Sequence, residues 1–337
     1  MQGRKVGIEI GAKIVPSARV RGKGMGKRLS DQVVLRAKMA IETTMGEACS
    51  LHHFDDSDRL KTLLAEEPAG CIQDPATVLR HLLSTDPHFK IPTGGTYAER
   101  FARRGHDLVL AARDRARLEA LATRLRQESG VTVDILQADL TKSGDLAAVE
   151  TRLRDDQRIG ILVNNAGAGL AGDFEEQPSD DIERLVTLNT TAVVRLANAV
   201  AARFVKAGQG AIINIGSVVG LAPEFDMTVY GATKAFVLFL SQGLNFELAP
   251  KGVYVQAVLP AATRTEIWER AGADINALPA MMEVGELVDA ALVGFDRREA
   301  VTIPPLHDAG QWDAYQAARQ LPGFSQIHAA ERYHTAA

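Results

Sequence analysis

Tyr230 and Lys234 are residues whose types and spacing suit proton transfer. They stand four positions apart in the segment VYGATK, so on a helix they would share one face, with their Cβ atoms about 6 Å apart. A lysine ammonium beside a phenol favours the phenolate and lowers a phenol pKa that is otherwise about 10. The spacing therefore predicts a general acid or base at Tyr230, although an exposed pair on a helix surface would show the same spacing.

Further polar residues follow short apolar runs on either side of this pair. Ser217 ends the apolar run AIINIGS, thirteen residues before Tyr230, and Asn189 stands among apolar neighbours in TLNTT. The run GILVNNAG ends in residues 164–167, which combine amide groups with very little side-chain bulk. Parallel strands end at one edge of their sheet, where open α/β folds bind ligands, so these residues predict one site at that edge.

The site requires a regular frame of strands and helices. Beyond about residue 95, strand-like runs from DLVLAA to AVTIPP alternate with amphipathic helix-like runs such as RARLEALATRLRQES. Short apolar strands separated by helices of ten or more residues are typical of right-handed βαβ crossovers and of a parallel sheet buried on both faces. The sequence therefore predicts an α/β fold with a doubly wound, Rossmann-like parallel sheet and an atypical N-terminal extension.

The chain resembles the short-chain dehydrogenase/reductases. The residues that carry the resemblance are NNAG at residues 164–167, Asn189, Ser217 and Tyr230-x-x-x-Lys234. The resemblance implies a catalytic tetrad made of these residues. Tyr230 would transfer the proton, and Ser217 would hydrogen-bond the substrate oxygen. Lys234 would lower the pKa of the tyrosine and hold the nicotinamide ribose, while Asn189 would position a water in the proton relay.

The resemblance also implies contacts to a nicotinamide dinucleotide. Asp139 and Leu140 follow the third strand and would lie beside the adenine. Pro260 and Thr265 follow the sixth strand, with Ala261 in place of the glycine that the family has there. The implied cofactor contacts are Gly94, Arg113, Asp139, Leu140, Asn165, Ala166, Gly167, Tyr230, Lys234, Pro260 and Thr265.

The choice between the two dinucleotides depends on the tip of the second strand. The segment LVLAARD has no carboxylate at the position that would bind a free ribose 2′-hydroxyl, and it has Arg113 instead. A guanidinium suits a 2′-phosphate, so NADP(H) is favoured. NAD(H) is the alternative because the next residue is Asp114. A shift of one residue in this turn would bring its carboxylate to the ribose.

The glycine loop that the family has between its first strand and first helix is incomplete in this chain. Gly94 can serve as the last glycine, but Pro92 stands where the preceding one should be, and the residues before it do not form a strand pattern. We therefore divide the chain into an atypical segment of unknown role, residues 1–95, and a dehydrogenase-like domain, residues 96–337. Because backbone N–H groups of this loop meet the pyrophosphate, we expect weak dinucleotide binding unless residues 1–95 supply the loop.

Two segments of the N-terminal part could replace what is missing. The segment RKVGIEIGA, residues 4–12, is the best candidate for the missing strand. The triplet Gly22, Gly24 and Gly26 is a candidate for the phosphate loop, and a flexible basic segment is the alternative meaning of this triplet.

Composition and charge indicate an ordinary globular protein with no nucleic-acid or membrane partner. The net charge is −4, and no apolar run approaches the roughly 18 residues that would span a bilayer. The first thirty residues are basic, as in an organellar leader or a nucleic-acid arm, but a solvated tail has the same composition. Cys49 and Cys71 lack metal-type spacing, so we expect reduced thiols, a cytoplasmic protein and no metal site.

The resemblance to the short-chain dehydrogenase/reductases implies an NAD(P)(H)-dependent oxidoreductase that transfers hydride between the nicotinamide and a small carbonyl or alcohol substrate. The resemblance implies a homodimer or homotetramer formed through helices near 180–206 and 228–248. Apolar residues after the sixth strand would contact the substrate: Ile267, Trp268, Leu278, Met281 and Met282. The alternative is a catalytically impaired relic that serves as a binding or assembly module.

Overall fold

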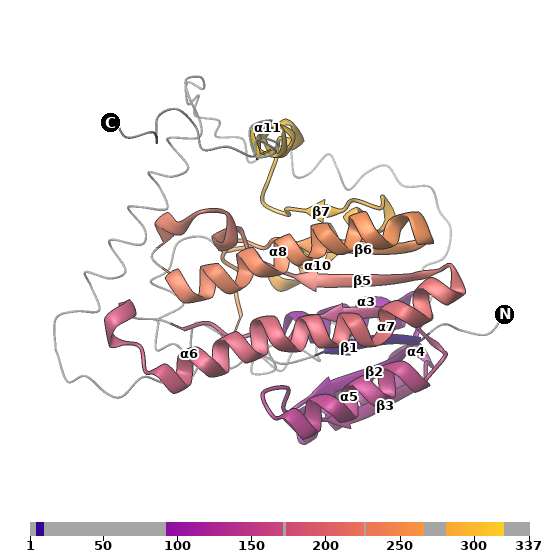
Figure 1. Ribbon diagram of the computed structural model, residues 1–337. Helices are drawn as coiled ribbons and strands as arrows, with labels where there is room; N and C mark the ends of the chain where they lie inside the picture. Colours follow the sequence, from indigo (N-terminus) through magenta and orange to yellow (C-terminus); the bar gives the residue numbers. More distant parts are fainter. Residues whose placement is uncertain (1–4, 10–91, 171–172, 226, 266–280, 320–337) are drawn as a thin grey trace, which may run out of the picture.

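A computed structural model of the chain describes residues 5–9, 92–170, 173–225, 227–265 and 281–319. These residues form one parallel sheet in the order β3-β2-β1-β4-β5-β6-β7, with helices on both faces (Figure 1). The strands are β1 (Lys5–Glu9), β2 (Asp107–Ala112), β3 (Val133–Gln137), β4 (Ile159–Asn164), β5 (Gly210–Ile215), β6 (Val253–Val258) and β7 (Val301–Thr302). The predicted doubly wound α/β fold is confirmed.

The helices follow the strands in the order that right-handed crossovers require. The helices are α3 (Thr93–Arg103), α4 (Arg115–Ser129), α5 (Ser143–Asp155), α6 (Ser179–Val186), α7 (Val193–Ala207), α8 (Thr228–Leu248), α10 (Val284–Asp296) and α11 (Ala309–Arg319). A π-helix, η2 (Thr187–Ala192), joins α6 to α7, and a short 3₁₀-helix, η3 (Val218–Leu221), follows β5.

The first strand of the sheet comes from the N-terminus of the chain. β1 lies between β2 and β4, pairing Val6 with Leu108 on one side and with Ile161 on the other. The sequence led us to expect that the first strand is missing or replaced, and named residues 4–12 as the candidate to fill the gap. Within that candidate, residues 5–9 form the strand, while residues 4 and 10–12 lie outside the described residues, and residues 10–92 separate the strand from helix α3. The division of the chain at residue 95 stays a prediction, although residues 5–9 belong to the same sheet as the rest.

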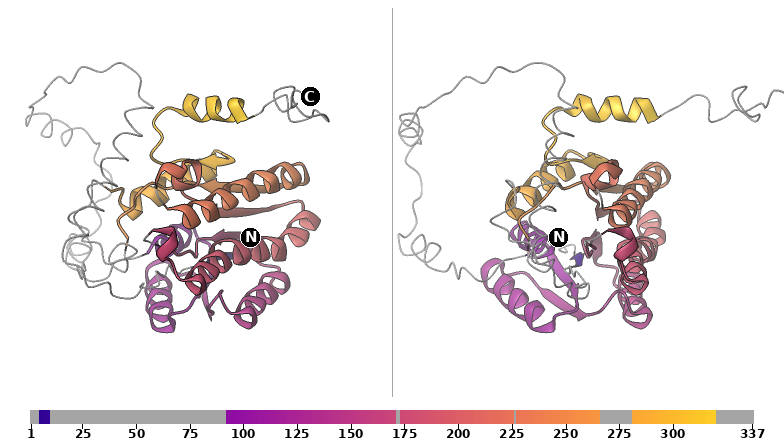
Figure 2. Two further views of the ribbon diagram at one scale, coloured as in Figure 1. Left: turned by 60° about the vertical axis from the view of Figure 1, so that its left-hand side comes forward. Right: turned by 90° about the vertical axis from the view of Figure 1, so that its left-hand side faces the viewer.

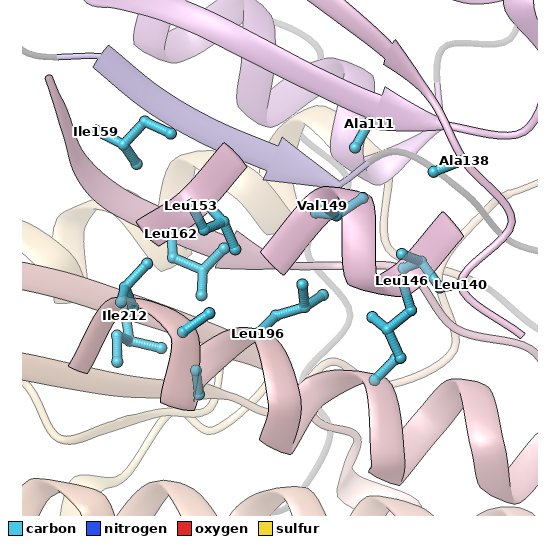
Figure 3. Packing of buried hydrophobic residues seen from close by; sticks show 14 of the residues in the cluster. Ala111, Ala138, Leu140, Leu146, Val149, Leu153, Ile159, Leu162, Leu196 and Ile212 are labelled. Atoms are coloured by element: carbon cyan, nitrogen blue, oxygen red, sulfur yellow. The ribbon is translucent and has the colours of Figure 1, made fainter. Parts of the chain in front are cut away.

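Alternating strand side chains build a hydrophobic core on each face of the sheet. Leu108 and Leu110 of β2 join one cluster with Tyr97 and Phe101 of α3. Val109, between them, joins the opposite cluster, which also contains residues of α5 and α7. Figure 3 shows part of this second cluster, where Leu146, Val149 and Leu153 of α5 gather with Leu162 of β4 and Leu196 of α7.

The helices α6, η2 and α7 run on continuously from Ser179 to Ala207 (Figure 2). Within the described residues, this stretch is long and apolar enough to cross a membrane by length and composition, and half of its most apolar window is buried in the protein. Its buried residues include Leu196 and Phe204, which pack in the second cluster. On α8, by contrast, Phe239 and Phe246 are exposed, and the predicted assembly through these helices stays a prediction.

Gly220 allows η3 to lie directly against helix α8. A Cβ atom at this position would lie 2.6 Å from the backbone nitrogen of Ala235 and 2.7 Å from the backbone carbon of Lys234. Backbone atoms inside a helix cannot move aside as a flexible side chain can. Any side chain at position 220 therefore pushes η3 and α8 apart.

We expect Gly220→Ala to lower the free energy of unfolding by about 1–3 kcal/mol, the usual cost of overpacking. The matched control is Gly243→Ala on α8, where a Cβ would meet nothing within 4 Å. That variant should raise the free energy of unfolding by about 0.5–1 kcal/mol, because alanine favours the helix. Urea denaturation of both variants measures the difference, and equal effects would contradict the close contact at Gly220.

Candidate active site

Ser217 and Pro260 lie together at the carboxyl edge of the sheet. Ser217 follows β5 in an extended conformation, and its Oγ accepts a hydrogen bond from the backbone N–H of Val219 at 3.2 Å. The same hydroxyl lies 3.4 Å from the Pro260 carbonyl, and the N–H of Val218 donates to that carbonyl at 3.0 Å. The loops after β5 and β6 are thereby joined, and Ser217 is nearly buried.

Tyr230 and Lys234 stand one helical turn apart near the start of α8, as the spacing predicted. The Lys234 ammonium lies 5.6 Å from the centre of the Tyr230 ring. It donates a hydrogen bond to the carbonyl of Ile215, the last residue of β5, at 2.9 Å. Lys234 therefore ties the helix to the strand that leads to Ser217.

Burial decides the ionisation of both residues. It raises the pKa of Tyr230 above its usual value, and a hydrogen bond from Ser217 lowers it by less. Burial also lowers the pKa of Lys234 to about 8. The prediction that the pKa of Tyr230 is lowered is therefore wrong for the protein alone, because burial of the phenol disfavours the phenolate more than the hydrogen bond from Ser217 favours it.

Asn189 lies in the π-helix, buried against the loop that follows β4. Its Oδ1 accepts from the N–H of Ala168 at 2.9 Å, and its Nδ2 donates to the carbonyl of Ala168 at 2.9 Å and to Thr233 Oγ1 at 3.0 Å. Both N–H groups of the amide are thus used. A water in a proton relay would have to be held at another atom, so this part of the prediction stays a prediction.

The small residues after β4 lie near Asn189 and Lys234. Asn165, Ala166 and Gly167 are half-buried. A Cβ atom at Gly167 would lie 3.4 Å from Asn189 Oδ1 and 3.5 Å from Lys234 Nζ. The absence of a side chain therefore leaves room next to the ammonium, as a ribose between Lys234 and this loop would require.

Arg113, Asp139 and Leu140 lie at the ends of β2 and β3. Burial opposes ionisation of Asp139, but hydrogen bonds from the backbone and hydroxyl of Thr141 and the charges of Arg113 and Lys142 hold its pKa below the usual value. Leu140 is buried. A small pocket beside Arg113 is also lined by Thr141, Ala168 and Leu188, so the ends of β2, β3 and β4 converge there.

The structure describes only part of the remaining predicted site. Gly94 is buried in the first turn of α3, whose N-terminus follows Pro92. Thr265 is half-buried in the segment that follows β6. Among the predicted substrate contacts, Met281 and Met282 are partly buried, and the N–H of Met282 donates to the carbonyl of Ala262 at 3.1 Å. The glycine triplet and three predicted substrate contacts lie outside the described residues: Gly22, Gly24, Gly26, Ile267, Trp268 and Leu278.

Sequence reasoning missed Gly220 and Thr233. Gly220 lets the segment after Ser217 approach α8, and Thr233 holds Asn189. The signals were a glycine three residues after the serine and a hydroxyl residue directly before the lysine. Neither signal identifies its partner, because both partners are far away in the sequence.

Replacing Lys234 tests its burial through the pH dependence of stability. Between about pH 8 and 10.5, the unfolded chain still binds the lysine proton that the folded chain has released. The stability of the wild type should therefore rise with pH across this window, by up to about 1.4 kcal/mol per pH unit relative to Lys234→Met. Below pH 8 both states carry the proton, so the difference between the proteins should be constant there.

Urea denaturation at pH 7, 8, 9 and 10 measures this difference. Lys251→Met, at an exposed lysine, controls for the loss of one positive charge. If wild type and Lys234→Met show parallel pH profiles from 8 to 10, Lys234 is not desolvated as described.

Comparison with known proteins agrees with this geometry. Residues 93–276 match the family of short chain dehydrogenases. A very-long-chain 3-oxoacyl-CoA reductase of Bos taurus is 32% identical over 212 residues, which cover 58% of this chain and 68% of the relative. For other curated relatives, this chain spans only 56% to 60% of their length.

Two solved structures are more similar still. A short-chain dehydrogenase from Sphingobium yanoikuyae, in complex with NADPH, is 71% identical with a TM-score of 0.70, covering 72% of this chain and 95% of that one. A bulky-bulky ketone specific alcohol dehydrogenase from Comamonas testosteroni is 64% identical with a TM-score of 0.67, covering 72% and 94%. This chain belongs to the short chain dehydrogenase family and is an NAD(P)-dependent oxidoreductase.

Proposed function

We propose that this protein is an NADP(H)-dependent alcohol dehydrogenase that interconverts ketones and secondary alcohols, with Tyr230 as its acid and base. The observation that carries the proposal is the meeting of Ser217, Tyr230 and Lys234 at the carboxyl end of β5. The Ser217 hydroxyl hydrogen-bonds the Tyr230 phenol, and the Lys234 ammonium lies 5.6 Å from the centre of the phenol ring. This set can hydrogen-bond a carbonyl oxygen and move a proton to it.

The residues around this point fit a nicotinamide dinucleotide. Gly167 leaves space beside Lys234, and the pocket near Arg113 lies where the adenosine half would reach the ends of β2 and β3. The N-terminus of α3 supplies the positive end of a helix dipole for a phosphate. When bound, the nicotinamide supplies or accepts the hydride.

The chain's own groups handle the proton. Because the pKa of Tyr230 is raised, its phenol is protonated at neutral pH and can donate to the carbonyl oxygen during reduction. Ser217 hydrogen-bonds the same oxygen and keeps it in line with the phenol. In the direction of alcohol oxidation Tyr230 must lose its proton, and the ammonium of Lys234 stabilises the resulting phenolate.

Two contacts support NADP(H) over NAD(H). Arg113 lines the small pocket, and its charge acts on Asp139. The carboxylate of Asp114, the alternative ligand for a free ribose, accepts a hydrogen bond from Arg117 N–H at 3.0 Å and caps helix α4. The cap engages one of the two carboxylate oxygens and directs the side chain towards helix α4, which disfavours a contact with a ribose hydroxyl. The similar Sphingobium yanoikuyae structure holds NADPH.

For the substrate we propose ketones that carry an apolar group on each side of the carbonyl. The segment after Ser217 contains Val218, Val219 and Leu221, all partly exposed, and Val218 and Leu221 also pack against the cluster around Leu238. Apolar side chains there favour apolar substituents. The Comamonas testosteroni relative is described as specific for bulky-bulky ketones. The relic without activity is not favoured, because the tetrad residues hold defined contacts and the relatives are reductases and dehydrogenases.

Replacing Tyr230 tests the proposed chemistry. In the full chain, Tyr230→Phe should reduce NADPH-linked turnover of a panel of aryl and alkyl ketones by at least about 100-fold, since only the proton-transferring oxygen is lost. NADPH affinity, from fluorescence titration, should change little. Tyr315→Phe, at a partly exposed tyrosine on α11, is the matched control and should keep full turnover. Tyr230→Phe with more than a tenth of the wild-type rate would rule out the role.

Replacing Arg113 tests the cofactor preference. Arg113→Ala should weaken NADPH binding roughly tenfold or more, because a charge-assisted contact to phosphate is lost, and should leave NADH binding nearly unchanged. Arg115→Ala is the control, since this exposed arginine pairs with Glu119 at 2.8 Å. Equal losses for NADPH and NADH in Arg113→Ala would contradict the assignment.

A further inference from the structure

Thr233 lies between the two proposed catalytic residues of α8, three positions after Tyr230 and one before Lys234. Its side chain is buried, with 3% of its surface exposed. Its hydroxyl donates to the carbonyl of Tyr230 at 2.7 Å and accepts from Asn189 Nδ2 at 3.0 Å. The turn of helix that sets the Tyr230–Lys234 geometry therefore has a hydrogen bond that most helical turns lack.

The hydrogen bonds continue from Asn189 to the loop after β4. The amide of Asn189 exchanges two hydrogen bonds with the backbone of Ala168, the residue after Gly167. A continuous series of contacts thus runs from the Tyr230 carbonyl through Thr233 and Asn189 to this loop. It joins three elements that carry the site: helix α8, the π-helix and the carboxyl end of β4.

The chemistry of a hydroxyl gives this series a direction. A threonine has one O–H donor, and Thr233 uses it on the Tyr230 carbonyl, so towards Asn189 it can only accept. Asn189 must therefore present its N–H₂ group to Thr233 and its oxygen to the N–H of Ala168. Since the amide could otherwise be rotated by half a turn, Thr233 fixes its orientation.

We propose that Thr233 is a positioning residue that holds Tyr230 and Lys234 in register with the loop that carries Gly167. It does not touch the reacting atoms itself. This inference rests on the proposed function of Tyr230. Without the hydroxyl, the Asn189 amide loses one of its acceptors, and α8 loses its hydrogen-bonded link to the π-helix. The tyrosine and lysine then shift relative to the substrate, and a small misplacement of reacting groups is costly in rate.

The test uses the full chain and two substitutions at position 233. Thr233→Val keeps the shape and removes the hydroxyl, whereas Thr233→Ser keeps both hydrogen bonds. For NADPH-linked ketone reduction, we expect Thr233→Val to lower kcat about tenfold or more with little change in KM, and Thr233→Ser to stay within about twofold of wild type. In alcohol oxidation, the apparent pKa of kcat should move upward in Thr233→Val, because the phenolate is then less well stabilised by Lys234.

A neighbouring threonine provides the matched control. Thr190, next to Asn189 in the π-helix, donates to the carbonyl of Val186 at 2.6 Å and takes no part in the series. Thr190→Val should leave kcat and its pH profile unchanged. If Thr233→Val does not fold, Thr233→Ala compared with Thr233→Ser gives the same kcat and pH measurements.

Several results would overturn the inference. Wild-type kcat and pH profile in Thr233→Val would do so, as would equal losses in the valine and serine variants. A lower melting temperature in Thr233→Val with unchanged kcat would assign Thr233 a purely structural role. Tyr230→Phe, measured in parallel, separates the two proposals: if it keeps turnover, the proposed function itself is wrong, whatever the Thr233 variants show.

Discussion

The central strand of a parallel sheet must be hydrogen-bonded on both sides, and the whole structure depends on this requirement. Between β2 and β4, unpaired N–H and C=O groups would face an apolar interior, which costs free energy comparable to the lost hydrogen bonds. The strand Lys5–Glu9 meets the requirement, pairing with both neighbours in parallel. The next element of the described chain is helix α3, which leads into β2. With β1 paired on both sides, the sheet is continuous, and the parallel strands β4, β5 and β6 all end at the same edge. The candidate site is built from the residues just beyond these strand ends.

Buried polar contacts hold helix α8 against this edge. Asn164 of β4 donates to Asn214 of β5 at 2.8 Å, and Asn214 donates to Ser241 of α8 at 2.9 Å. Lys234 donates to the end of β5, and Gly220 lets η3 press against the same turn of the helix. Buried polar groups of this kind are costly unless they are paired, so each contact allows little freedom in where α8 can lie. The position of Tyr230 follows from these contacts more than from the helix itself.

Local patterns in the sequence were enough to predict the fold and the clustering of the tetrad. Strand periodicity predicted the sheet, and the segment RKVGIEIGA was the best candidate for the missing strand, of which Lys5–Glu9 forms β1, because a buried strand needs a short apolar run whatever its place in the chain. The predictions that failed concern properties that are set by residues distant in the sequence. The spacing of Tyr230 and Lys234 suggested a lowered phenol pKa, but the burial that raises it comes from packing. Likewise the role of Thr233 follows from Asn189, on a different helix, and both N–H groups of Asn189 are used by Thr233 and Ala168, which lie far from it in the sequence.

Amide hydrogen exchange of the full chain, followed by mass spectrometry, tests the central claim most directly, because it reports on β1 without changing it. If Lys5–Glu9 completes the sheet, amides of Val6 to Glu9 should exchange as slowly as those of β4 and β5 and open only with the whole domain. Exchange of these amides at the rate of an unstructured peptide, with β4 and β5 still protected, would contradict the account. The sheet would then be completed by another segment, and the origin of the first strand would have to be assigned anew.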